Sequence, residues 1–155
     1  MQELISAKFA LKNLYNKSNV VFIDSTFHLP NSGRNALEEF NSCHIPNARF
    51  FDINKISDQS SDLPHMLPNE VFFSKMVGKL GINNDDTIVA YDNSIFFSSA
   101  RAWWMFKIFG HKNLKIVDGG FKAWKDQGGP LERKENIFKE TTYVAQKINL
   151  NLYDN

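Results

Sequence analysis

The fold is decided by the stretch Thr87-Ile-Val-Ala-Tyr-Asp92, followed by the loop Asn93-Ser-Ile-Phe-Phe-Ser98 and by Ser99-Ala-Arg-Ala-Trp-Trp-Met-Phe-Lys-Ile-Phe109. The first segment is short, β-branched and bounded by polar residues, which predicts a buried strand. The last segment has no helix breaker and is apolar around most of its circumference, which predicts a buried helix. Backbone N–H groups at the start of such a helix point into the preceding loop and attract anions. Because ligands of open α/β sheets bind beyond the carboxyl ends of the strands, we expect any pocket here.

The flanking segments show the same two patterns. Short apolar runs predict further strands at residues 20–24, 49–53 and 114–118. Apolar residues at helical spacing and capping residues predict helices at residues 1–17, 36–40, 70–80 and 121–127, with Asn69 as an N-cap and Gly81 as a left-handed C-cap. Strands that alternate with helices predict an α/β fold in three layers, with a central parallel sheet and helices on both faces.

Composition limits the classes of protein. A length of 155 residues predicts one domain, at residues 1–130, and the charged, Asn-rich residues 131–155 are expected to form a linker or C-terminal arm outside the core. A net charge of +1 without a basic cluster argues against a nucleic-acid surface. No apolar run approaches the ~20 residues of a membrane span, so we expect no membrane contact. One cysteine and no secretory pattern at the N-terminus favour a reducing, cytoplasmic location.

Four predicted strands end at or beside an aspartate, namely Asp24, Asp52, Asp92 and Asp118. Aspartate is common at such turns because its side chain bonds nearby backbone N–H groups. No P-loop and no dinucleotide fingerprint follows a strand, and the histidines are scattered, so we expect no cofactor and no metal. The single cysteine, Cys43, follows a helix and not a strand, so we expect it to be a buried structural thiol.

Four groups of residues form a recognisable series along the chain. They are Asp24-Ser-Thr-Phe-His-Leu-Pro30; Phe40-Asn-Ser-Cys-His-Ile-Pro-Asn-Ala48; Phe50-Phe-Asp-Ile53 with Leu63-Pro-His-Met-Leu-Pro68; and Ser98-Ser-Ala-Arg-Ala-Trp-Trp-Met-Phe106 with Asp118-Gly-Gly-Phe-Lys-Ala-Trp124. Together they resemble the rhodanese family, specifically the N-terminal half of the two-domain sulfurtransferases that act on thiosulfate or 3-mercaptopyruvate. Asn47 stands where the family prefers glycine, and asparagine tolerates the same left-handed backbone.

The resemblance implies a mechanism. In rhodaneses a cysteine at the end of the central strand begins the active loop, and its thiolate takes a sulfane sulfur from a donor. The resulting persulfide passes that sulfur to a thiophilic acceptor such as cyanide or a thiol. Here Asp92 stands at that position, as in the family's catalytically silent half. We therefore expect the chain alone to be inactive, and the catalytic cysteine to lie in a second rhodanese domain in cis.

The resemblance also assigns site residues. The degenerate active loop comprises Asp92, Asn93, Ser98, Ser99 and Arg101. We expect this loop to form a nest that is satisfied by its own carboxylate. Arg101 is expected to form a structural ion pair with Asp92 or Asp118, and contact with the sulfur donor is the alternative.

Four residues are expected to form one wall of the substrate pocket: Phe27, His65, Phe96 and Phe97. An apolar wall would keep water from a persulfide, and His65 would bond an oxygen of the donor. The alternatives are ordinary core phenylalanines and a histidine that stabilises its loop. Phe97 and Asn54 stand where mercaptopyruvate-type members tend to have Tyr and Asp, so the preferred donor stays open.

Two functions remain after the resemblance is taken into account. The first is the N-terminal half of a sulfurtransferase that uses a small sulfur donor and a thiol or cyanide acceptor. The alternative is a non-catalytic rhodanese-like module that recognises a partner or a small anion. A cysteine-bearing second domain after residue 155 would separate the two.

Overall fold

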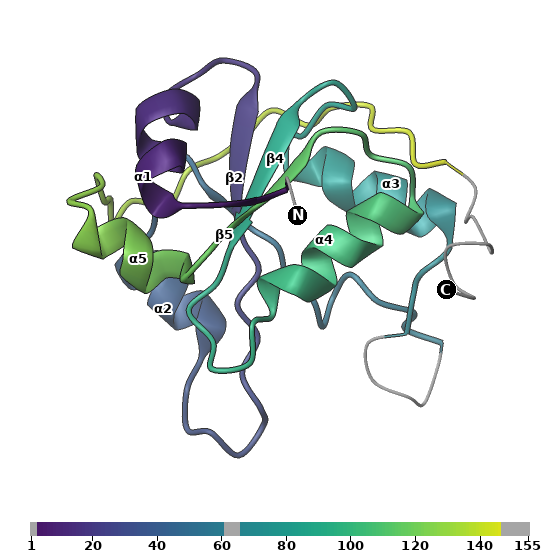
Figure 1. The fold of residues 1–155 in the computed structure, drawn as a ribbon. Helices are drawn as coiled ribbons and strands as arrows, with labels where there is room; N and C mark the ends of the chain where they lie inside the picture. The colour runs from purple at the N-terminus through teal and green to yellow at the C-terminus, as the bar shows by residue number, and fades with distance from the viewer. Residues whose placement is uncertain (1–2, 61–65, 147–155) are drawn as a thin grey trace.

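A parallel sheet forms the centre of the computed structural model, which describes residues 3–60 and 66–146 (Figure 1). Within those residues the sheet has five strands in the order β1-β5-β4-β2-β3. The strands are β1 (Leu4–Ile5), β2 (Val20–Asp24), β3 (Arg49–Phe50), β4 (Thr87–Tyr91) and β5 (Leu114–Val117). Every neighbouring pair is parallel, and β4 lies in the middle, as the sequence predicts.

Helices cover both faces of the sheet (Figure 1). They are α1 (Ala7–Phe9), which continues into the π-helical η1 (Ala10–Leu14), α2 (Ala36–Ser42), α3 (Glu70–Lys79), α4 (Ser99–Ile108) and α5 (Gly120–Asp126). Alternation along β2 places Val21 and Ile23 in the core under α3 and α4, and Phe22 in the core under α1, α2 and α5. The predicted three-layer α/β fold is therefore confirmed.

The helix caps and the left-handed turn that the sequence predicts are present in the structure. The Asn69 side chain accepts a hydrogen bond from the Phe72 backbone N–H at 2.8 Å, which caps α3. Gly81, just beyond this helix, has a φ of 73°, and Asn47 has a φ of 65°. Asparagine thus holds the left-handed turn in place of glycine.

The prediction of one helix over residues 1–17 is wrong at its start. Leu4 and Ile5 form the edge strand β1, which pairs with Ile116 and Val117 of β5. The helical segment begins only after Ser6, whose hydroxyl accepts a hydrogen bond from the Phe9 N–H at 3.0 Å. A two-residue strand is too short to show a period of its own, so only its pairing with β5 defines it.

The third strand is also shorter than predicted, ending at Phe50 and not at residue 53. The cause is the side chain of Asp52, which accepts hydrogen bonds from the backbone N–H groups of Asn54 and Lys55. This turn diverts the chain from the sheet.

The expectation that the residues after position 130 lie outside the core is wrong for the described part. That part, residues 131–146, leads from the α5 side of the sheet to the α3 side, and Tyr143 and Ala145 belong to the core beneath α3 and α4 (Figure 1). The Thr141 N–H donates to the Gly78 carbonyl at 2.9 Å. A Cβ on Gly78 would lie 2.5 Å from the Thr141 oxygen, so the close approach requires glycine. The sequence hides this packing because the segment has no periodic pattern.

Among residues 3–60 and 66–146, no helix combines the length and the apolar character that crossing a lipid bilayer requires.

The packing of the arm predicts unequal effects at two adjacent positions. Tyr143 is 4% exposed, whereas Val144 is 60% exposed. We expect Tyr143→Ala to lower the free energy of unfolding in urea by roughly 3 kcal/mol, because it leaves a cavity in the core. Val144→Ala is the matched control and should change it by less than about 0.5 kcal/mol. Equal, small effects would mean that the arm does not contribute to the core.

Candidate functional site

The carboxyl ends of β2 and β4 meet at one edge of the sheet. We call this edge, with the loops at residues 25–28 and 92–98, the crest. The strands pair in register up to Asp24 and Tyr91, and the Ser25 N–H then donates to the Tyr91 carbonyl at 3.0 Å. The two loops therefore leave the sheet side by side.

The carboxylate of Asp92 fills the loop nest. Its Oδ1 accepts hydrogen bonds from the backbone N–H and the hydroxyl of Ser94, at 3.1 and 3.0 Å. Its Oδ2 accepts one from the N–H of Ser99, the first residue of α4, at 2.7 Å. The side chain of Ser98 does not cap α4, so Asp92 supplies the negative charge at the helix start. The expected bonding of the Asp92 carboxylate by the start of α4 is present, whereas the expected part of Asn93 in the nest is not.

Ser98 joins the two loops of the crest. Its hydroxyl donates to the Ser25 carbonyl at 2.8 Å and accepts from the Phe27 N–H at 3.1 Å. The N–H of Asn93 does not contribute to the nest, because it donates to the Thr26 hydroxyl at 2.9 Å. The sequence interpretation missed Thr26, although its place two residues after Asp24 is typical of a turn in which aspartate bonds the following backbone.

A second carboxyl group, that of Asp24, lies buried beneath the same loops. Its Oδ1 accepts hydrogen bonds from the N–H and the hydroxyl of Thr26, at 2.9 and 2.5 Å. Burial raises the pKa of Asp24 to about 6, and the charge of Asp92 adds to the increase, while the bonds from Thr26 oppose it. The crest thus holds one carboxylate in a nest and one carboxyl group that takes up a proton near pH 6.

The expected ion pair of Arg101 is not found. Within the described residues no salt bridge joins Arg101 to Asp92 or Asp118, and the guanidinium carbon lies 4.9 Å from the centre of the Trp104 ring. The nest already provides Asp92 with backbone donors, so it does not need this cation.

Arg101 instead borders an apolar hollow of about 240 Å³ at the crest, with Phe27, Ile53, Phe96 and Ser98. The rings of Phe27 and Phe96 meet edge to face at 5.7 Å. Phe96 is 43% exposed, so it is not an ordinary core residue. The structure therefore brings these two of the four predicted wall residues together.

The other two predicted wall residues are not among the described residues that line this hollow. Phe97 is 48% exposed, has a φ of 60° and does not line this hollow. His65 lies outside the described residues, so its role stays a prediction.

Three polar side chains support the crest from one side, and the sequence did not predict any of them as site residues. Arg34 donates through Nε to Glu39 at 2.8 Å and through Nη2 to the Asn93 carbonyl at 3.1 Å. His28 bonds the same carboxylate at 2.7 Å. Partial burial raises the pKa of Glu39, but the bonds from Arg34 and His28 outweigh it and lower the pKa overall. Arg34 thus connects α2 to the loop of β4.

Cys43 is half-buried and unpaired, so the expectation of a buried thiol is wrong. The residue caps the C-terminus of α2, where its N–H donates to the Glu39 carbonyl. It borders a broad surface hollow that Asn93 also borders. The amides of Ser94 and Ser99 are bonded to Asp92, so they are not directed at this thiol. Residues 3–60 and 66–146 contain no cluster of His, Cys, Asp and Glu that fits a metal ion.

These features define the class of protein: a parallel α/β domain whose central strand is followed by a loop that bonds its own carboxylate and leads directly into a helix. The chain belongs to the rhodanese family, because the family model described as "Rhodanese-like domain" matches residues 7–127.

The similar proteins include sulfurtransferases of greater length. A "3-mercaptopyruvate sulfurtransferase" of Mus musculus is 38% identical over 148 residues, which cover 92% of this chain and 50% of the relative. "Thiosulfate/3-mercaptopyruvate sulfurtransferase 1, mitochondrial" of Arabidopsis thaliana is 39% identical over 131 residues, 84% of this chain and 34% of the relative. The crystal structure of SseA from Escherichia coli superposes with a TM-score of 0.85 and 32% identity, covering 95% of this chain and 56% of SseA. The chain thus spans half or less of these curated relatives, and it matches the N-terminal domain of such two-domain enzymes.

The buried carboxyl of Asp24 predicts a pH-dependent stability. The folded chain holds this proton up to about pH 6, whereas the ordinary pKa of an aspartate carboxyl group is 3.8. The stabilisation is therefore complete below pH 3.8 and is lost as the pH rises through 6. Between pH 4 and 7 the loss amounts to roughly 2 kcal/mol, at about 1.4 kcal/mol per pKa unit. Asp24→Asn should remove this part of the pH dependence in urea unfolding experiments.

Asp118→Asn is the matched control, because Asp118 also follows a strand but is exposed. It should retain the wild-type pH dependence. Parallel stability curves for Asp24→Asn and the wild type would contradict the shifted pKa of Asp24.

Proposed function

We propose that this chain is the non-catalytic N-terminal half of a sulfurtransferase that moves sulfane sulfur from thiosulfate or 3-mercaptopyruvate to cyanide or a thiol. The observation that supports this most directly is the carboxylate of Asp92, which accepts the hydrogen bonds of Ser94 and Ser99 at the end of the central strand. Similar proteins named sulfurtransferases support the reaction class.

Sulfur transfer needs a thiolate, because only a deprotonated sulfur is nucleophilic enough at neutral pH to attack the donor. Loop amides and a helix start would lower the pKa of such a thiol. In this chain the same donors are used by the Asp92 carboxylate, a poor nucleophile towards sulfane sulfur. A second rhodanese domain in cis is therefore proposed to supply the cysteine.

The crest hollow is proposed to form one wall of the shared pocket. Phe27 and Phe96 present apolar surface that would exclude water from a persulfide. Arg101 borders the same hollow, and its guanidinium would attract the anionic oxygens of the donor. His65 and Phe97 are proposed to line the shared pocket through the family motif alone, with Phe97 outside the crest hollow. We further propose a reducing, cytoplasmic setting, since the single cysteine, Cys43, is unpaired and thiol acceptors stay reduced there.

The proposal predicts that this chain alone forms no thiocyanate from thiosulfate and cyanide. Cys43→Ala should give the same background rate, because Cys43 lies away from the nest donors. Turnover that persists in Cys43→Ala would show another nucleophile, and turnover that disappears in Cys43→Ala would identify Cys43 as the nucleophile.

A second prediction concerns the protein with its second domain attached. Phe96→Ala should lower kcat/KM about fivefold, since truncating a half-exposed ring removes roughly 1 kcal/mol of apolar contact. Ile137→Ala is the control, because this side chain is 97% exposed on the arm, and it should leave kcat/KM unchanged. Equal activity of the two variants would exclude the wall role. Absence of sulfur transfer by the whole protein would favour the alternative of a binding module.

A further inference from the structure

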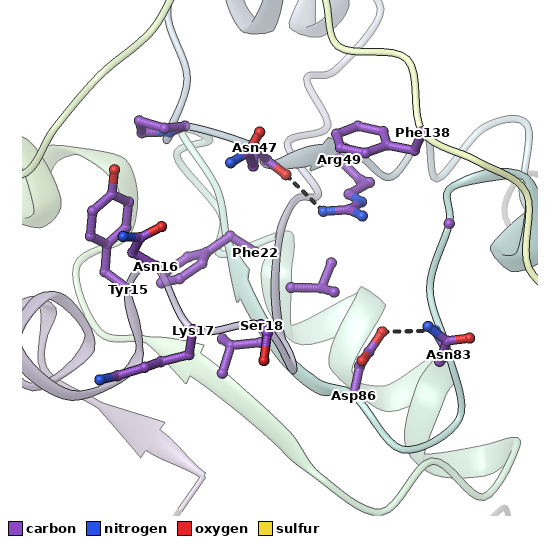
Figure 2. A pocket seen from close by; sticks show the side chains of 14 residues that line it. Tyr15, Asn16, Lys17, Ser18, Phe22, Asn47, Arg49, Asn83, Asp86 and Phe138 are labelled. Carbon is purple, nitrogen blue, oxygen red and sulfur yellow. Dashed lines mark hydrogen bonds between the residues drawn. The ribbon is translucent and has the colours of Figure 1, made fainter.

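A second cavity, of about 520 Å³, lies at the opposite edge of the sheet from the crest (Figure 2). Val20 and Arg49, the first residues of β2 and β3, line it, and so does Asp86, which immediately precedes β4. Its volume is within the range of small-molecule sites, about 300–1,000 Å³. The proposed sulfur transfer does not use this cavity.

One wall carries a fixed guanidinium group. Arg49 donates through Nε to the Leu80 carbonyl and through Nη1 to the Asn47 carbonyl, both at 2.9 Å. The ring of Phe138 covers one face of the guanidinium, with 3.7 Å between its centre and the Arg49 Cζ. Within residues 3–60 and 66–146, no hydrogen bond engages Nη2 and no carboxylate forms a salt bridge with Arg49. This cation is therefore held in place without a direct counter-ion.

The facing wall carries a carboxylate. Asp86 is 8% exposed, and its Oδ2 accepts a hydrogen bond from the Asn83 N–H at 2.8 Å. Figure 2 shows Asp86 and Arg49 on separate walls of the cavity, with no bond drawn between them. Burial lowers the pKa of Arg49 and the charge of Asp86 partly offsets this, so the two groups interact across the space between them.

The backbone around the cavity is also unusual. Three described residues other than glycine have a positive φ, and two of them, Asn16 and Asn47, line this cavity with φ values of 62° and 65°. Asparagine adopts this left-handed conformation more readily than most residues, so both positions are turns that shape the wall of the cavity. Figure 2 shows the Asn16 side chain between Tyr15 and Phe22, and Asn47 beside Arg49.

A partly buried cation and a buried anion that face each other without contact are complementary to a ligand with both charges. A ligand with one charge would leave the other ion uncompensated, which is costly away from water. We propose that this cavity binds a free α-amino acid, whose carboxylate pairs with Arg49 and whose ammonium group pairs with Asp86. The side chain of the amino acid would pack on Tyr15, Phe22 and Phe138. Lys17, exposed on the rim, adds attraction for the carboxylate.

The proposal is tested by saturation-transfer NMR of the chain against the twenty proteinogenic amino acids. We expect at least one to bind saturably at about 10 mM or below. The deaminated acid and the carboxamide of that amino acid should each bind at least about tenfold more weakly, since each leaves one wall unpaired. Backbone amide shifts of ¹⁵N-labelled protein should change at Asn16 and Asn83 and not at Ser94 or Ser99.

Two variants test the walls directly. Arg49→Gln and Asp86→Asn should each weaken binding at least about tenfold, and Asp86→Asn keeps an acceptor for the Asn83 N–H. Lys17→Gln should weaken it a few-fold, whereas Lys12→Gln, an exposed lysine outside the cavity, should not. Circular dichroism verifies that each variant is folded. If a variant unfolds, analogue binding and amide chemical shifts measured on the wild type still test the proposal. The proposal is overturned if no amino acid saturates, if the deaminated acid binds equally well, if shifts map to the crest, or if both folded wall variants bind normally.

Discussion

The carboxylate of Asp92 accepts hydrogen bonds from the backbone at both ends of one loop, at Ser94 and at Ser99. This single anion satisfies donors that the start of α4 would otherwise direct at a ligand. It also holds Ser98 where its hydroxyl can bond the loop that follows β2. The conformation of the crest therefore depends on an internal charge.

The charge of Asp92 affects the neighbouring carboxyl group of Asp24. Asp24 ends the adjacent strand, and its carboxyl is buried close enough to Asp92 for their charges to interact. Burial is the main reason that the protonated form of Asp24 is favoured up to about pH 6, and repulsion by the charge of Asp92 adds to this effect. The crest is thus organised for stability of its loops, and its apolar hollow beside Arg101 is the part that remains available to a ligand.

The opposite edge of the sheet is organised differently. There the hydrogen-bonding capacity of Arg49 is divided between the end of α3 and the turn at Asn47, and the arm residue Phe138 covers its guanidinium. The arm is held further along by Tyr143, whose hydroxyl bonds His111 at 2.8 Å. A segment without helix or strand periodicity therefore completes both the core and one wall of a cavity.

The sequence by itself determined the features that depend on neighbours along the chain. The local patterns include strands β2, β4 and β5 and the start of β3. They also include the caps at Asn69 and Gly81, the left-handed turn at Asn47 and the aspartate that follows the central strand. Only the tertiary structure decided that Leu4 and Ile5 join the sheet, that Tyr143 is core, that Arg101 borders a hollow and does not pair with Asp92, and that Arg49 faces Asp86. These features join residues that lie far apart along the chain, and their energies come from pairing, burial and charge across that separation. No local period or motif records such contacts, so folding alone brings them together.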